Sequence, residues 1–539
     1  MLSGSDIIIN TLIEQGCDVI FGYPGGQVLD IYESLYKYKD KIKHVLTAHE
    51  QGAAHAADGY ARSTGKVGVA FATSGPGATN LVTGIATAYL DSIPVVLITG
   101  NVRTDQIGTD SFQEIDITGI TLPITKHNYF VSDIGELADT IREAFELASS
   151  GRPGPVLVDV AKDVQTAKCE YVPAPKVQPD ESRAAKDIRI EAAAEIINES
   201  DRPYIYFGGG IITAGAEDEL IALSEKIDAP MGCSLMGISA VPTSNERFLG
   251  MEGMHGHYAS SIALSKADCI ISLGVRFNDR ATGSREQFAK KAKIVQIDVD
   301  GSELSKNITA DVGMRGDVKL TLQKLISLLE DKTHPKWNEE IDQLRQKEEE
   351  LSDTREGMTP KNIMDVISTF IDEDTPVVTD VGQHQMWAAQ YLDIKKQRRF
   401  ISSGGLGTMG FSLGASIGTY FATGLSPIMI AGDGGFGMCL NEMATAVTND
   451  VPVTIVILNN GVLGMVRQMQ TLFLGGHYSQ TTLERKTDFV ALAKAFVFMN
   501  APSPTAPKSR MLIIFIAPYS GQSNDPGTGA CRQTDSIRR

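Results

Sequence analysis

Two side chains that could hold a metal ion, Asp433 and Asn460, each follow a short apolar run that predicts a buried strand. Residues 427–431 (Pro-Ile-Met-Ile-Ala) lead into Gly432-Asp433-Gly434, and residues 453–458 (Val-Thr-Ile-Val-Ile-Leu) lead into Asn459-Asn460. Positions 435 to 458, 24 residues, separate the two motifs and leave room for a crossover helix, which residues 441–448 suggest. Parallel strands joined in this way end at the same edge of a sheet, so we expect both side chains at one ligand-binding edge.

The residue types at this edge suit a diphosphate held through Mg²⁺. A carboxylate, an amide oxygen and a nearby backbone carbonyl are ligands for a hard cation, which keeps further octahedral positions for phosphate oxygens and water. The glycines beside Asp433 allow backbone N–H groups to approach the phosphates. Gly-Asp-Gly alone is weak evidence, because an aspartate that closes a tight turn is common. Together with the spacing and Asn459-Asn460 it resembles the pattern of thiamine diphosphate-dependent enzymes.

Such enzymes also need a carboxylate beside the aminopyrimidine ring of the cofactor, so that this ring can take the proton from C2 of the thiazolium. Glu50 is the candidate. It stands in the first turn of a predicted helix, 49–62, whose small side chains allow close approach. The alternative is that Glu50 only stabilises the helix N-terminus as an acidic residue in the first turn.

Length, composition and charge limit the number of domains and the class of protein that this chain can be. A chain of 539 residues is too long for one hydrophobic core and predicts about three domains. Its 42% hydrophobic and 21% charged content is that of an ordinary globular protein, and the net charge of −17 argues against a nucleic-acid partner. The amino terminus lacks the pattern of a signal peptide, and no stretch reaches the length of a membrane span. We therefore expect a cytoplasmic protein with no membrane partner.

The cysteines indicate neither a zinc site nor a disulfide framework. Six of them are scattered along the chain without metal-ligand spacing, and they read as reduced, mostly small core residues.

Predicted strands that end in glycine turns alternate with helical patterns, which indicates parallel α/β layers. Strands are expected at 18–22, 67–71, 94–98 and 155–160, and at 204–207, 269–273 and 294–298 in the middle of the chain. Proline-rich residues 170–186 and residues 331–360, a charged helical run followed by a polar stretch, look like linkers. We predict three doubly wound parallel-sheet α/β domains, 1–170, 187–330 and 358–496, with the third incomplete at its carboxyl end.

Residues 497–539 differ in composition from the rest of the chain. They hold five of the 22 prolines, and their five basic and two acidic residues give +3, which leaves −20 for the preceding 496 residues. No βα alternation is recognisable there. The segment is either a natural disordered tail or the product of a frameshift or assembly error. We favour the second, because the break interrupts a helical pattern that starts near Asp488. The chain is then expected to be impaired and to be cleaved early by proteases between residues 502 and 509.

Residues 1–496 resemble the catalytic large subunits of acetolactate synthase (acetohydroxyacid synthase), which use thiamine diphosphate and FAD. Some shared segments occur in many thiamine diphosphate enzymes, whereas residues 112–114 (Phe-Gln-Glu) and 382–387 are more specific. The matching segments are Phe21-Gly-Tyr-Pro-Gly-Gly26, residues 49–62, Thr73-Ser-Gly-Pro-Gly-Ala-Thr-Asn80, Ser111-Phe-Gln-Glu-Ile-Asp116, Gly151-Arg-Pro-Gly-Pro155, Val381-Gly-Gln-His-Gln-Met-Trp387, Gly404-Gly-Leu-Gly-Thr-Met-Gly410 and Asn459-Asn460.

The resemblance implies roles around the thiamine cofactor. Glu50 would be the aminopyrimidine partner, Gly26 a backbone neighbour of C2, and Gln113 and Lys162 polar groups near the substrate entrance. Met409 would be the apolar wedge that bends the cofactor. The ligands of Mg²⁺ would be Asp433, Asn460 and the carbonyl of Val462, and the diphosphate end would be lined by Gln383, His384, Gly432 and Gly434. Alternatively, Lys162 is a solvated lysine, Met409 plain core and His384 an ordinary hydrogen-bonding histidine.

The resemblance also implies an FAD site in the middle domain. An acidic residue that closes a Rossmann-like strand, Asp298, can accept ribose hydroxyl protons, and Arg276 can meet a phosphate. The positions carried over are Arg152, His255, Arg276, Asp298 and Asp317. Asn278 stands where an Asp is expected, a nearly isosteric exchange.

The implied reaction joins pyruvate to a second 2-oxo acid, either pyruvate or 2-oxobutyrate, in the biosynthesis of valine, leucine and isoleucine. The implied assembly is at least a homodimer, with a small regulatory subunit. At Met469 the resembling enzymes usually carry a tryptophan that contacts the extra methyl of 2-oxobutyrate, so we expect a preference for acetolactate formation; alternatively, Met469 is only a core substitution. Two rivals remain: a related pyruvate oxidase, and a catalytically inactive interaction protein.

Overall fold

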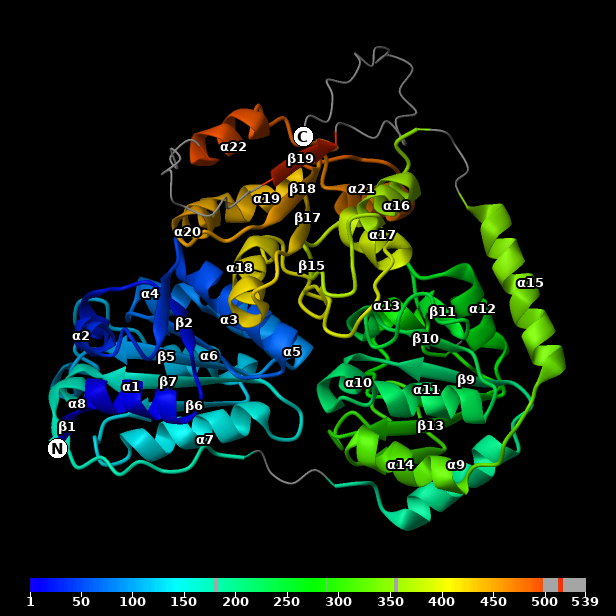
Figure 1. Cartoon of the computed structure of the whole chain (residues 1–539), viewed down its shortest axis with the longest axis horizontal. Coiled ribbons are helices and arrows are strands. Elements are labelled where there is room, and N and C mark those ends of the chain that lie inside the picture. Colours follow the sequence, from blue (N-terminus) through cyan, green and yellow to red (C-terminus); the bar gives the residue numbers. More distant parts are fainter. Residues whose placement is uncertain (179–182, 287, 353–356, 498–511, 517–539) are drawn as a thin grey trace.

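Three parallel sheets, each flanked by helices, organise the chain (Figure 1). The computed structural model describes residues 1–178, 183–286, 288–352, 357–497 and 512–516. Every neighbouring pair of strands in the three sheets is parallel, which confirms the predicted α/β class.

The amino-terminal sheet has the strand order β3-β2-β4-β5-β7-β6. Its central strands β4, β5 and β7 are buried along their whole length, as expected for apolar runs covered by helices on both faces. The strands of this sheet are β2 (Val19–Gly22), β3 (Lys43–Leu46), β4 (Gly68–Ala72), β5 (Val95–Asn101), β6 (His127–Val131) and β7 (Pro155–Ala161), and a short antiparallel pair joins β1 (Leu2–Ser3) to β8 (Lys168–Cys169). The helices are α1 (Gly4–Glu14), α2 (Leu29–Lys37), α3 (Glu50–Thr64), α4 (Pro76–Asn80), α5 (Val82–Asp91), α6 (Ile117–Thr121), α7 (Leu137–Ser149) and α8 (Lys162–Thr166).

The central sheet has the order β11-β10-β9-β12-β13-β14. Its strands are β9 (Pro203–Phe207), β10 (Met231–Cys233), β11 (Phe248–Met251), β12 (Cys269–Leu273), β13 (Lys293–Asp298) and β14 (Val312–Arg315). Its helices are α9 (Asp187–Asn198), α10 (Gly209–Ala214), α11 (Glu217–Lys226), α12 (Tyr258–Lys266), α13 (Asp279–Thr282) and α14 (Val318–Leu328).

The predicted linkers differ from each other. The described residues between β8 and α9 form no helix or strand, as expected of a linker. Residues 331–360, by contrast, contain α15 (Pro335–Leu351), which packs on α12 with Trp337, Ile341 and Leu344 buried. The predicted charged helix is therefore present, but its apolar stripe makes it a part of the central unit's surface.

The third sheet has the order β16-β15-β17-β18-β19. Its strands are β15 (Val377–Thr379), β16 (Phe400–Ile401), β17 (Ile428–Gly432), β18 (Thr454–Leu458) and β19 (Leu512–Ile516). Its helices are α16 (Pro360–Ser368), α17 (Gln383–Tyr391), α18 (Ser412–Thr423), α19 (Asp433–Cys439), α20 (Met443–Thr448), α21 (Gly464–Phe473) and α22 (Phe489–Val497). The predicted crossover thus consists of α19, a 3-10 turn (Leu440–Glu442) and α20.

The strand β19 corrects the expectation that residues 497–539 supply no element of the sheet. Residues 512–516 pair in parallel with β18 along its full length, from Thr454 opposite Leu512 to Leu458 opposite Ile516. The run Leu-Ile-Ile-Phe-Ile favours extended structure, and β18 would otherwise be an open edge. The predicted cleavage between residues 502 and 509 lies outside the described residues.

The amino-terminal and third units are joined by the close crossing of α3 and α18. A Cβ atom at Gly59 would collide with the backbone of Ala415, and one at Gly418 would collide with the carbonyl of Ala56. The small residues of α3 therefore serve to bring α18 close, a contact that the sequence pattern did not reveal. Within the described ranges, no helix combines the length and the apolar character needed to cross a membrane.

The role of β19 can be tested by two truncations. A chain that ends at residue 511 lacks β19 and leaves β18 as an exposed edge, so it should aggregate more and unfold earlier, by at least about 3 °C, the shift that about 1 kcal/mol produces in a domain of this size. The control ends at residue 516 and keeps the strand. Thermal unfolding with light scattering measures both, and identical curves for the two chains would show that β19 contributes nothing.

Candidate active site

The carboxyl ends of β17 and β18 lie side by side, as the sequence predicts. Gly432 pairs with Leu458, so Asp433, which opens α19, stands beside the Asn459-Asn460 turn. Asp433 is buried, and burial raises its pKa, while the N–H groups of Gly434 and Gly461 favour the ionised form. Asn460 accepts a hydrogen bond from the N–H of Val462 at 3.1 Å and keeps a second lone pair on the same oxygen. The three proposed metal ligands therefore come from one edge of one sheet.

Three further predicted residues surround this edge. A Cβ atom on Gly432 would lie 3.2 Å from Nδ1 of His384, and one on Gly434 would lie 3.4 Å from the terminal methyl of Met409. A Cβ on Gly464 would collide with the side chain of Gln383. The glycines thus bring the backbone close to side chains from α17 and from the loop before α18.

His384 has an unused polar atom at this place. The ring is buried, and its Nε2 has no hydrogen-bond partner. Burial lowers the pKa of His384 to about 4, despite the nearby Asp380. A neutral histidine with an unpartnered ring nitrogen fits a bound polar group, because buried polar atoms are rarely left unpaired.

Asp380 is a site residue that the sequence analysis missed. It follows β15 at the same sheet edge and has no exposed surface. Its carboxylate accepts hydrogen bonds from the N–H of Gly410 at 3.0 Å and from the hydroxyl of Ser412 at 2.7 Å. It therefore fixes the backbone directly after Met409. The signal was available, because a strand followed by a polar residue is the same pattern that identified Asp433.

The predicted residues of the amino-terminal unit form a second group. Glu50 opens α3 and is 9% exposed, and one of its carboxylate oxygens accepts a hydrogen bond from Asn80 at 2.9 Å. The other oxygen faces Gly77, whose Cβ would lie 3.2 Å away. Gln113 has a left-handed backbone, with φ of 62°, and lies against Gly75. Among the described residues, no hydrogen-bond donor contacts the second oxygen of Glu50, which lies on the side of the glycine turn.

Lys162 and Gly26 are directly connected. The ammonium of Lys162 donates to the carbonyl of Gly26 at 3.1 Å and forms an ion pair with Asp30 at 2.6 Å. In the part of the chain that the structure describes, no atom outside the neighbouring residues lies within 4 Å of a Cβ built on Gly26. Lys162 is thus held in place, and the backbone at Gly26 is open to approach.

The two groups are linked through Glu442, a second residue that the sequence analysis did not identify. Glu442 ends the 3-10 turn after α19, and it accepts a hydrogen bond from the N–H of Ala48 at 3.1 Å, just before α3. No hydrogen bond or ion pair within the described ranges joins Glu50 directly to Asp433 or Asn460. The start of the Glu50 helix is therefore tied to the crossover that begins with Asp433.

A cavity of about 870 Å³ lies between the central unit and its neighbours, a volume typical of ligand sites. It brings together all five residues that the resemblance assigns to FAD, and Met469 also lines it. The lining includes Arg152, His255, Arg276, Asp298, Asp317, Met469, Gly404 and Gly405.

The charges in this cavity are of both signs. Burial and the neighbouring Arg152 lower the pKa of Arg276, whereas burial raises the pKa of Asp298 to about 6. Arg152 is paired with Glu303 at 3.0 Å, and Asp317 caps α14 by accepting the N–H of Leu320 at 2.9 Å. Arg276 and Asp298 are therefore charged groups of opposite sign that are only partly compensated inside the cavity.

His255 adds a second unpartnered ring nitrogen. Its Nε2 is buried without a hydrogen bond, and burial lowers the pKa of the ring. With Arg276 and Asp298 it supplies a donor, an acceptor and a neutral ring, a set that fits a ligand carrying both phosphate and hydroxyl groups.

Comparisons with known proteins show which family the chain is similar to. Three family descriptions match the chain: thiamine pyrophosphate enzyme, N-terminal TPP binding domain, over residues 2–120; central domain, over residues 190–325; and C-terminal TPP binding domain, over residues 380–508. The acetolactate synthase of Mycobacterium bovis is 45% identical over 92% of this chain and 82% of its own length. Acetolactate synthase isozyme 3 large subunit of Escherichia coli is 42% identical (92% and 89%), and the large subunit of Corynebacterium glutamicum is 43% identical (92% and 81%).

The chain belongs to the acetolactate synthase large subunit family. The matched N-terminal domain contains Gly26, Glu50 and Gln113, and the matched C-terminal domain contains Asp433 and its neighbours. The match to the C-terminal TPP binding domain extends to residue 508, beyond the predicted end of the third domain at residue 496.

Proposed function

We propose that this chain is the catalytic subunit of an acetolactate synthase in branched-chain amino acid biosynthesis. Pyruvate loses CO₂, and its remaining two carbons form a new bond to the carbonyl carbon of a second 2-oxo acid. The product is 2-acetolactate with pyruvate as acceptor, or 2-aceto-2-hydroxybutyrate with 2-oxobutyrate. The observation that carries the proposal is the shared strand edge, which presents Asp433 beside Asn460, in a chain whose matched domains are named for thiamine pyrophosphate.

Thiamine diphosphate, when bound, would supply an acidic carbon that adds to a 2-oxo acid and a thiazolium ring that accepts the electron pair left behind when CO₂ departs. Glu50 would hold a proton at N1′ of the aminopyrimidine, since the hydrogen bond from Asn80 leaves its second oxygen available. Asp380 would keep Met409 in place through the N–H of Gly410. Lys162, fixed on Gly26 and Asp30, would place a positive charge at the substrate entrance for the carboxylate of the 2-oxo acid.

Mg²⁺ would be held by Asp433, Asn460 and the carbonyl of Val462. Oxygen ligands of this kind suit Mg²⁺, which leaves other positions for phosphate oxygens and water. A divalent cation would also keep Asp433 ionised against the effect of burial. His384 and Gln383 would meet the diphosphate from α17.

FAD would occupy the large cavity. Arg276 would bind a phosphate, and Asp298 would accept a hydrogen bond from a ribose hydroxyl. The unpartnered Nε2 of His255 would form a hydrogen bond to the ligand. In the reaction proposed, electrons are not transferred between substrate and flavin, so its role is structural.

The proposal includes a homodimeric assembly with a smaller subunit, in the cytoplasm. The Glu50 and Asp433 groups lie in different units, which supports a site completed between two copies of the chain. Relatives named large subunits support a smaller accompanying subunit. The described cysteines are free, which supports a reducing compartment, the cytoplasm.

Glu50→Gln should reduce acetolactate formation about 100-fold or more, because an amide cannot exchange a proton with the aminopyrimidine as a carboxylate does. Thiamine diphosphate should still bind, but the exchange of its C2 proton for deuterium, followed by NMR, should slow in parallel. Glu33→Gln, on the exposed side of α2, is the control and should change neither rate. Near-normal exchange in Glu50→Gln would remove Glu50 from this role.

Asp433→Asn should weaken the binding of thiamine diphosphate with Mg²⁺ at least about tenfold, since the amide lacks the charge that holds the cation. Calorimetric titration measures the affinity. Asp365→Asn, an exposed exchange on α16, should leave it unchanged. Equal affinities in the two variants would contradict the metal assignment.

FAD affinity should fall as the pH falls through about 6, where Asp298 takes up a proton in the free protein. Ribose hydroxyls donate best to the ionised carboxylate, so binding favours the form that predominates above this pH. The loss should amount to at most about tenfold per pH unit for one proton. Fluorescence titration of FAD measures it, and Asp298→Asn should bind weakly with a flatter profile. The same pH profile in both proteins would exclude Asp298 as the titrating group.

Met469→Trp should raise the preference for 2-oxobutyrate over pyruvate about tenfold, because a flat indole gives the extra methyl a defined contact. Competition between the two acceptors, with both products quantified, measures the preference in the full chain. Met465→Trp is a matched control, since Met465 lies one turn earlier on α21 and lines the same cavity. If both variants change the product ratio equally, Met469 has no specific role.

A further inference from the structure

The loop between β16 and α18 forms part of two sites at once. Residues 403–407 line the large cavity, and the loop continues through Met409 to Gly410. Positions 404, 405, 407 and 410 are glycines, and Gly407 and Gly410 have positive φ angles of 68° and 88°. A segment this rich in glycine has many alternative conformations, so contacts from outside must select one.

A buried ion cluster of the amino-terminal unit supplies such contacts. The guanidinium of Arg62 on α3 pairs with Asp58 one turn earlier and with Asp91 at the end of α5, at 2.8 Å for Asp91. Its third branch donates to the carbonyl of Ser402 at 2.8 Å. The side chains of Asp58 and Asp91 are fully buried, and that of Arg62 is 6% exposed. Arg62 is therefore fixed by both carboxylates, and its remaining N–H group binds the first residue of the loop, Ser402.

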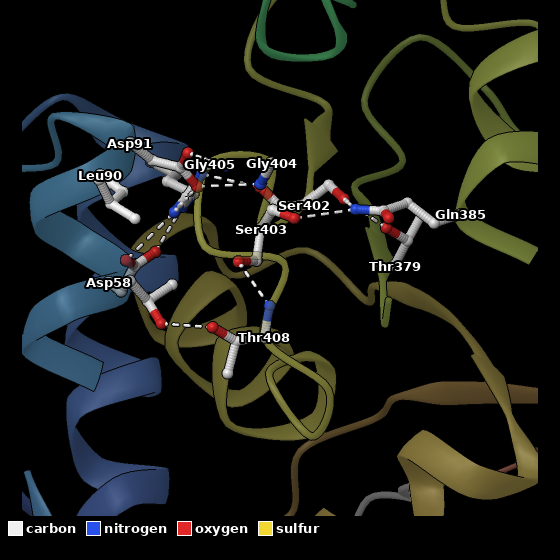
Figure 2. Close-up of polar contacts among 12 residues, drawn as sticks. Asp58, Leu90, Asp91, Thr379, Gln385, Ser402, Ser403, Gly404, Gly405 and Thr408 are labelled. Carbon is white, nitrogen blue, oxygen red and sulfur yellow. Dashed lines mark hydrogen bonds and ion pairs between the residues drawn. The ribbon is translucent and has the colours of Figure 1, made fainter. Parts of the chain in front are cut away.

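Asp91 holds Gly404 and Gly405, two and three residues further along the loop. Its carboxylate accepts the N–H of Gly405 at 2.6 Å and that of Gly404 at 3.1 Å. A Cβ at Gly405 would lie 2.8 Å from the same carboxylate, so the backbone sits directly on it. Figure 2 shows Asp58 and Asp91 on the amino-terminal helices, facing Ser402 to Gly405 across the unit boundary.

The residues around this ion cluster also contact the central unit. The carbonyl of Leu90, next to Asp91, accepts a hydrogen bond from Arg276, one of the residues proposed to bind FAD. Arg398 donates to the carbonyls of Arg62 at 3.2 Å and of Ile212 at 2.7 Å. The ion cluster therefore lies where all three units join, and its Asp91 lines the cavity together with Arg276.

Neutral contacts hold the remainder of the loop. The amide of Gln385 donates to Ser402 at 2.7 Å and to the carbonyl of Ser403 at 2.9 Å (Figure 2). Near the other end, the hydroxyls of Thr87 and Thr408 are hydrogen-bonded at 2.7 Å. Because Thr87 belongs to α5, the amino-terminal unit holds the loop at two separate points.

We propose that Arg62 is a positioning residue that fixes the loop of residues 402–410, and through it the FAD cavity and Met409. A guanidinium fork is needed because three acceptors in different directions must be satisfied at once, which a single ammonium cannot do. The flavin part of this inference rests on the proposed function.

The test compares the full-length wild type with Arg62→Lys by two measurements. Hydrogen exchange of the cofactor-free protein should show lost protection in peptides covering residues 402–410, with β15 and β17 still protected. FAD titration should show a Kd about tenfold higher, the effect of losing one hydrogen bond to a charged group. The kcat should fall while the KM for pyruvate stays within about twofold, because the loop and not the substrate contact changes.

Arg142→Lys is the matched control. Arg142 on α7 makes a similar fork, to both oxygens of Glu14 at 2.8 and 2.9 Å and to the carbonyl of Val172, away from the cavity. It should lower thermal stability and leave the FAD Kd and the exchange of residues 402–410 unchanged. An equal rise of Kd in both variants, or unchanged exchange and Kd in Arg62→Lys, would overturn the proposal.

Thr87→Val gives an independent test if Arg62→Lys does not fold. It removes the hydrogen bond to Thr408, together with the bond that the same hydroxyl donates to the carbonyl of Thr83 within α5, and it keeps the side-chain shape. The same two changes should appear to a smaller extent, and unchanged values would overturn the claim that anchoring of the loop shapes the cavity. If the wild type itself does not bind FAD, the flavin part of the proposed function fails, while hydrogen exchange still decides the role of Arg62.

Discussion

The parallel pairing of β15, β17 and β18 is the constraint on which the rest of the third unit depends. Parallel neighbours end at the same edge, so the residues that follow them, Asp380, Asp433 and Asn460, are brought together whatever lies between them in sequence. The crossovers must then leave this edge through tight turns. Glycines at 432, 434 and 464 permit this, because a side chain at any of them would press on Leu463, His384 or Gln383.

Buried carboxylates hold much of this geometry, and they do so mainly by accepting backbone N–H groups. Asp380 holds Gly410, Glu442 holds Ala48, and Asp91 holds Gly404 and Gly405. A carboxylate with several backbone donors is satisfied without solvent, and it fixes the chain where no side chain would fit. The contacts of Glu442 and Asp91 also join the amino-terminal and third units beside the site, in addition to the close crossing of α3 and α18.

The sequence predicted those features of the site that depend on local residue patterns. The strand ends at Asp433 and Asn460 were predictable because each lies one or two residues beyond an apolar run. Most residues around the large cavity came from the family resemblance, since Arg152 and His255 are far apart in sequence and share no local signature, whereas Asp298 closes a predicted strand. The strand β19 was not predicted. Its five apolar residues lie in a segment of atypical composition, and no clear helical pattern precedes them, so they were not interpreted as a strand.

The ion cluster was missed for a different reason. Arg62 and Ser402 are separated by 340 positions, and Asp91 and Gly405 by 314. In the sequence, Arg62 and Asp58 look like an ordinary i, i+4 pair on a helix surface, which is usually solvated. These side chains are buried because α18 packs on α3. The residue pattern of neither helix indicates that the other is its packing partner.

The central claim, that this chain condenses two 2-oxo acids, is tested most directly by its product. The full chain is incubated with pyruvate, thiamine diphosphate, Mg²⁺ and FAD, the products are identified by NMR, and oxygen and the flavin spectrum are followed together. The account predicts acetolactate, with one CO₂ released for each molecule formed, no oxygen consumption and an oxidised flavin. Acetate formed with oxygen uptake or flavin reduction would indicate an oxidase, and the absence of product together with no binding of thiamine diphosphate would indicate a protein without this catalytic function.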